Sequence, residues 1–179
     1  MDFNLYFAWA AWITLLIIVL SRPLADLSHF NVISRVKMKR KYLGLLCGLW
    51  VLLHVLVYSI SFNFPLTFFF NLSYWNFSTA FGWGLLAFVT MLPLLVTSNI
   101  YSIRLLKRNW VRIQKLTYLF FIASGIHIYM IGGKWLYTIV PMSIWAVVWI
   151  AAYLRNRSRL QYSRIASRVP SPPLSNLPS

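Results

Sequence analysis

Two of the three histidines lie within long apolar runs, and they are the residues whose type and position could do chemistry. His54 follows the last basic residue before its run, Lys41, by 13 positions. His127 follows the last basic residue before another run, Lys115, by 12 positions. If both runs are helices that leave the same side of a membrane, the two imidazoles reach nearly the same depth, somewhat past the midplane. An ionisable side chain at that depth is costly, so each is a candidate functional residue.

Two neutral imidazoles from two helices can bind a metal ion, and imidazole suits iron. Axial ligation of a haem would use both nitrogens, and the aromatic, apolar surroundings suit a porphyrin. The alternative is that each histidine only forms a hydrogen bond to a neighbouring helix. For one histidine we favour that alternative, whereas for His54 and His127 at equal depth we favour haem ligation.

One basic residue, Lys134, is expected on the outer side, two helical turns beyond His127. It is a candidate partner for a haem propionate. The competing interpretation, at least as strong, is a lysine that extends to the membrane interface while its stem stays apolar.

The composition is that of a membrane protein, with 60% hydrophobic, 18% aromatic and only 11% charged residues. The net charge of +15 comes from short basic blocks between apolar runs, as the positive-inside rule predicts, so nucleic acid is not an expected partner. Both acids, Asp2 and Asp26, lie outside the apolar runs, which excludes carboxylate catalysis and carboxylate metal sites. A single cysteine, Cys47, excludes an internal disulfide and is expected to be a packing residue.

The apolar runs predict an all-α membrane bundle with five transmembrane helices at about 3–20, 42–61, 80–99, 116–131 and 135–154. Arg22-Pro23 is expected to end the first helix, and Pro93 to kink the third. Residues 62–79 are expected to form an external interfacial loop, and residues 132–134 a tight external turn. Residues 1–154 would form one transmembrane domain.

The basic residues predict the orientation, because 16 of the 17 fall on one side of this five-helix arrangement. The N-terminus is therefore expected outside and the C-terminus in the cytoplasm. Residues 155–179 would be a cytoplasmic tail, first basic and then rich in proline and serine, which we expect to be disordered.

Four motifs accompany these runs: Leu-Ser-Arg-Pro-Leu at 20–24, Arg-Lys-Tyr-Leu-Gly-Leu at 40–45 before His54 and Tyr58, Thr-Ser at 97–98, and Trp-Val-Arg-Ile-Gln-Lys-Leu-Thr-Tyr at 110–118 before His127. With their spacings, they resemble the ferric reductase-like transmembrane domain family. Within it they are most similar to the haem-binding membrane subunits of protein-methionine-sulfoxide reductase systems. The resemblance covers all five predicted helices.

The resemblance implies that His54 and His127 are the axial ligands of a haem iron. Where relatives carry a histidine in a Leu-His pair, this chain has Gln114, and glutamine is a poor iron ligand. We therefore expect one haem b, in the outer half of the bilayer, and no second haem nearer the cytoplasm.

The leading hypothesis is a b-type haem protein of the cytoplasmic (inner) membrane that passes electrons toward an acceptor at the outer face. No glycine-rich nucleotide fingerprint follows the last run, so the donor would be a separate flavoprotein or a quinol. The acceptor would be a separate protein, ferric iron or another small oxidant. If haem is bound, the chain is an oxidoreductase-type electron-transfer subunit. The alternatives are a haem-free scaffold or assembly subunit of the same fold and, least favoured, a small channel or transporter.

Overall fold

The computed structural model describes residues 3–28, 33, 35, 39–62, 67 and 71–166, with the backbone only for 159–166. All regular structure in this part of the chain is helical, which confirms the all-α prediction. The elements are α1 (Phe3–Leu27), α3 (Arg40–Ser61), the 3-10 turn η2 (Leu72–Tyr74), α4 (Ala80–Val96), α5 (Ile100–Leu106), α6 (Arg108–Gln114), α7 (Leu116–Met130) and α8 (Trp135–Ala166).

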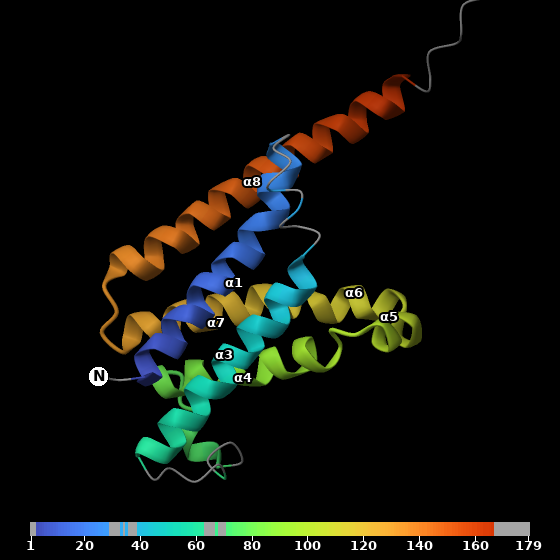
Figure 1. Cartoon of the computed structure of the whole chain (residues 1–179). Helices are drawn as coiled ribbons and strands as arrows, with labels where there is room; N and C mark the ends of the chain where they lie inside the picture. Colours follow the sequence, from blue (N-terminus) through green and yellow to red (C-terminus); the bar gives the residue numbers. More distant parts are fainter. Residues whose placement is uncertain are drawn as a thin grey trace, which may run out of the picture.

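The five longer helices form a bundle of two closely packed pairs with a fifth helix across them. α1 lies along α3, α4 lies along α7, and α8 packs against α1 and α7 (Figure 1). Successive long helices reverse their direction along the chain (Figure 1). As a result, α3 and α7, which carry the two histidines, run the same way.

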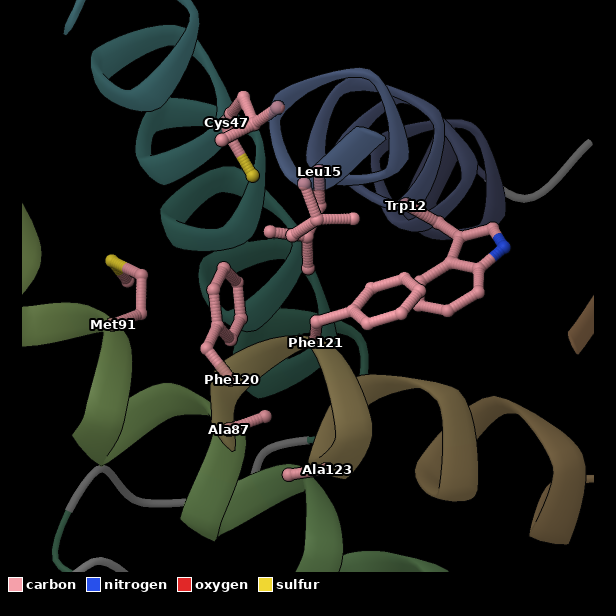
Figure 2. Close-up of a cluster of buried hydrophobic side chains, with 10 residues drawn as sticks. Trp12, Leu15, Cys47, Ala87, Met91, Phe120, Phe121 and Ala123 are labelled. Atoms are coloured by element: carbon pink, nitrogen blue, oxygen red, sulfur yellow. The ribbon is translucent and has the colours of Figure 1, made fainter. Parts of the chain in front are cut away.

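The core lies where the two helix pairs meet, and α1, α3, α4 and α7 all contribute to it (Figure 2). Trp12 of α1 stacks on Phe121 of α7 with ring centroids 5.1 Å apart, and the Phe121 side chain is fully buried. Cys47 is also buried, and its thiol donates to the carbonyl of Ala11, 3.5 Å away. Cys47 is thus the packing residue that its isolation in the sequence predicts.

Most of the apolar surface faces away from the core. Of the most apolar stretch of each of the three helices that could cross a membrane alone, α1, α3 and α8, only 11% to 28% is buried within the chain. Counting α4 and α5 as one span bent by 92° gives a fourth. Lipid is the medium that satisfies such surfaces, and we conclude that the chain is a multi-pass membrane protein. Among the described residues, α7 is shorter than these spans, with 15 residues.

The expectation that Arg22-Pro23 ends the first helix is wrong, because α1 continues to Leu27 with Pro23 inside it. Proline has a helix-compatible φ and removes only its own N–H bond, here the one to the Val19 carbonyl. The ladder resumes at once, since the backbone N–H of Ser28 donates to Leu24, 2.8 Å away. The guanidinium of Arg155 in α8 donates to the last carbonyl of the helix, that of Leu27.

The last helix is also longer than expected. α8 runs to Ala166, so the prediction of a disordered tail is wrong for 155–166, while 167–179 lie outside the described residues. The segment after Leu154 is rich in arginine, which has a high helix propensity, and it carries no proline before Pro170 to stop the helix. Pro141 lies inside the helix, as in the predicted span.

The third helix ends at Val96 rather than at 99. Thr97 and Ser98 donate to the carbonyls four residues earlier, at Pro93 and Leu94. The side chain of Asn99 then accepts from the backbone N–H of Ser102 and caps α5. These polar residues lie at the 92° change of direction between α4 and α5.

The expected tight turn between the last two helices is present. Gly132 has φ +98°, a left-handed conformation that glycine adopts without steric cost. The next N–H, of Gly133, donates to the carbonyl of Ile128, 3.0 Å away. The predicted 62–79 loop is described only in part, where Asn71 caps η2 through the N–H of Ser73.

We predict that Thr138→Val stabilises the protein. The Thr138 hydroxyl is fully buried in α8 and has no hydrogen-bond partner, and an unsatisfied buried hydroxyl costs about 1–3 kcal/mol. Thr90→Val is the matched control, because the Thr90 hydroxyl donates to the carbonyls of Leu86 and Ala87. Unfolding midpoints in one detergent should rise for Thr138→Val and stay level or fall for Thr90→Val. A lower midpoint for Thr138→Val would contradict the assignment.

Candidate functional site

The structure brings His54 and His127 near each other. His54 lies on α3 and His127 on α7, and both side chains are half-buried. The two helices run in the same direction (Figure 1), which is the condition on which the prediction of a common depth for the two histidines depends.

Both imidazoles are held by a main-chain carbonyl of another helix. Nδ1 of His54 lies 3.2 Å from the carbonyl oxygen of Asn4 in α1. Nδ1 of His127 lies 2.7 Å from the carbonyl oxygen of Ala80 in α4. A carbonyl oxygen can only accept, so these contacts place the ring proton on Nδ1 in both residues. Each Nε2 then carries a free lone pair, and neither has a hydrogen-bond partner among the described residues.

This tautomer is the one that metal-ligating histidines commonly adopt, with Nδ1–H bonded to a carbonyl and Nε2 on the metal. No group of three or more His, Cys, Asp or Glu side chains gathers anywhere in the described part of the chain. A bare metal ion would need more protein ligands than this pair supplies. Two imidazoles suit a metal whose remaining ligands come from a macrocycle, so the donor set fits haem.

Gly84 lets α4 approach the His127 ring. A Cβ added at Gly84 would lie 2.7 Å from Cε1 and 2.8 Å from Nδ1 of His127. The imidazole therefore rests on the bare backbone of α4, one turn after the carbonyl of Ala80 that it bonds. Any side chain at this position would displace the ring.

The other two residues singled out from the sequence are not in contact with this pair. Lys134 is exposed in the turn before α8. Its backbone carbonyl accepts a hydrogen bond from the N–H of Tyr137. Gln114 ends α6, at the opposite end of α7 from His127, and its side-chain amide donates to the hydroxyl of Thr97, 3.3 Å away. Gln114 lines a large cavity to which the described part of the chain contributes no histidine.

Sequence reasoning missed the groups that orient the histidines. The carbonyls of Asn4 and Ala80 belong to the main chain, so no residue type reveals them. Gly84 was visible only as one of two glycines in a Phe-Gly-Trp-Gly stretch, a spacing with several possible uses.

Comparison with known protein families shows to which family this chain belongs. The family described as "Ferric reductase like transmembrane component" matches residues 6–125. The chain belongs to this family. The matched region includes His54 and ends two residues before His127.

One curated relative is similar in sequence to this chain. The protein-methionine-sulfoxide reductase heme-binding subunit MsrQ of Rhizobium meliloti (strain 1021) is 33% identical over 110 residues. The matched region covers 60% of the present chain and 48% of the relative, so it spans about half of that protein. No solved structure matches the chain.

Proposed function

We propose that this family member is a haem-binding membrane subunit that transfers electrons, with His54 and His127 as the axial ligands of one haem b. The observation that carries the proposal is the pair of free Nε2 atoms, each oriented by an Nδ1 hydrogen bond to a carbonyl. The heme-binding description of the relative MsrQ supports the choice of cofactor.

The chain would contribute orientation and an apolar environment. When bound, the haem supplies one-electron chemistry between ferric and ferrous iron. The carbonyls of Asn4 and Ala80 hold the two rings in one tautomer and raise the basicity of each Nε2. Gly84 keeps the His127 ring against α4. Lys134 is proposed as a propionate partner only through its place in the turn just beyond α7.

We further propose five membrane spans, with residues 1–154 as one domain, the N-terminus outside and the C-terminus in the cytoplasm. The alternating helix directions support this arrangement (Figure 1), as does the placement of 16 of 17 basic residues on one side. α7 would be the fourth span in chain order and a short one, of about 22 Å at 1.5 Å per residue, packed along α4. The proposed location is the cytoplasmic (inner) membrane.

Electrons would come from a separate flavoprotein or a quinol and leave to a separate acceptor at the outer face. The name of the relative describes it as a subunit of a protein-methionine-sulfoxide reductase, which supports a protein partner for this chain as well. Gln114 is hydrogen-bonded to Thr97 and offers no strong iron ligand, which supports a single haem.

We predict that His54→Ala and His127→Ala each abolish haem retention. Removing either imidazole leaves the iron with one axial ligand from the chain. Protein expressed with added haem should carry about one haem per chain in the unmodified form, with sharp α and β bands in the dithionite-reduced minus oxidised spectrum.

The third histidine provides the matched control, since His29 lies outside the apolar runs of the sequence and outside the described residues. His29→Ala should keep the haem content and the spectrum unchanged. Unchanged haem in both ligand variants would refute the ligand assignment. A flat spectrum from well-folded unmodified protein would instead support the haem-free scaffold.

We predict that Gly84→Ala lowers haem retention although it removes no ligand. The new methyl group would overlap the His127 ring, so the ring must move and weaken its bond to Ala80. Gly44→Ala is the control, because nothing lies within 4 Å of a Cβ at Gly44. Haem absorbance per chain should fall severalfold for Gly84→Ala and stay constant for Gly44→Ala. Equal haem in both would show that Gly84 does not position the ring.

The orientation can be tested by labelling single cysteines in intact cells. Cys47→Ala removes the native thiol. In that background the cysteine of Lys134→Cys, which is exposed in the turn before α8, should react with a membrane-impermeant maleimide added outside. Arg108→Cys, exposed at the start of α6, should react only after the cells are opened. The reverse pattern would overturn the proposed orientation.

A further inference from the structure

The large cavity that Gln114 lines is at the end of the bundle away from the histidines. It lies between the last turns of α1, the start of α3, and α6, α7 and α8. Its volume is about 790 Å³, within the range of about 300–1,000 Å³ that is usual for ligand pockets. Among the described residues that line it there is no histidine.

The interior of this cavity is apolar. Its lining includes Leu15, Cys47, Met91 and Phe120, which belong to the core cluster drawn in Figure 2. Gly44 also lines the cavity, and a Cβ there would have no atom within 4 Å. The wall is therefore open at Gly44, next to Cys47 on the same helix.

The polar part of the lining is strongly basic. Arg22 of α1, Arg40 and Lys41 of α3, and Lys115 before α7 all line the cavity, against the single acid Asp26. Arg22 and Arg40 come from different helices and both line this one cavity. Neither guanidinium forms an ion pair within the described residues. Because Arg22 is on α1 and Arg40 is on α3, an anion bound between them would link the two helices.

We propose that this cavity binds an anionic phospholipid, with the phosphate between Arg22 and Arg40 and an acyl chain in the apolar space beside Gly44. Basic pockets between transmembrane helices on the cytoplasmic side are typical binding sites for anionic headgroups. Under the proposed orientation, this end of the bundle faces the leaflet where such lipids are found. The argument uses charge and shape and does not depend on a bound haem.

A neutral quinol would fill the apolar space but would not neutralise the charges of Arg22 and Arg40. A second haem carries anionic propionates, yet the described residues that line the cavity offer no imidazole to its iron, and Gln114 in the wall is hydrogen-bonded to Thr97. Charge complementarity therefore favours the phospholipid over both.

The test is a lipid titration of the full chain, purified in a non-ionic detergent, followed by native mass spectrometry. The probes are dioleoyl phosphatidylglycerol, which is anionic, and dioleoyl phosphatidylcholine, which is not. The unmodified protein should bind the anionic lipid at least about tenfold more tightly, and glycerol 3-phosphate, which has no acyl chains, should not compete.

The double variant Arg22→Gln/Arg40→Gln should bind the anionic lipid about 30-fold more weakly, because each basic residue near a headgroup contributes about one kcal/mol. Gly44→Phe fills the cavity and leaves the charges in place, and it should also lose the high-affinity site. The control Arg104→Gln/Arg108→Gln removes two exposed bases that do not line the cavity and should bind as the unmodified protein does.

Equal affinity for the two lipids would overturn the proposal and point to a neutral occupant such as a quinol. Undiminished binding in Arg22→Gln/Arg40→Gln would overturn it as well, and that result decides the matter even if Gly44→Phe fails to fold. A haem count of two per chain would assign the cavity to a second haem. Haem spectra are recorded on the same samples. A variant that loses lipid binding but keeps its haem spectrum tests the lipid site alone, whereas loss of the haem spectrum concerns the assignment of His54 and His127.

Discussion

The hydrogen bond from His127 to the carbonyl of Ala80 couples the chemistry of this protein to its helix packing. In an apolar medium an imidazole N–H without a partner is expensive, so this bond requires α4 to stay close to α7. Gly84 permits that approach because it has no side chain between the ring and the α4 backbone. The two helices accordingly pack along their length and form one half of the bundle.

The second histidine repeats this arrangement with a different helix. His54 of α3 bonds the carbonyl of Asn4 near the start of α1, the helix along which α3 packs. Each histidine is thus oriented by the main-chain carbonyl of the helix with which its own helix is paired. The aromatic contact between Trp12 of α1 and Phe121 of α7 then joins the two pairs.

The two ends of the bundle have different chemical characters. At the level of the histidines, two neutral rings present free nitrogen lone pairs and the described residues supply no acid. At the other end, four bases and one acid surround an apolar cavity. Gln114 belongs to the second end, where its amide donates to the hydroxyl of Thr97 and its side chain lines the cavity.

Several features follow from the sequence because they depend on local chemistry or on overall composition. Long apolar runs without charge must leave water, which predicts helices within a bilayer. The nearly equal spacing of His54 and His127 from the preceding basic residues predicts that they lie at about one level on parallel helices. Gly132 and Gly133 predict the tight turn because the chain there needs a left-handed residue.

Other features depend on contacts between segments that are distant in the sequence, and only the tertiary structure decides them. α1 passes through Pro23 to an end at Leu27 that Arg155 completes from α8, 128 positions away. The carbonyls that orient the histidines are main-chain atoms 50 and 47 positions away, with no signature in residue type. The basic cavity forms only when Arg22 and Arg40 meet across two helices. The sequence by itself determined the helical membrane class and the candidate ligands, because these follow from hydropathy and spacing, whereas ring orientation and cavity shape arise from packing between helices.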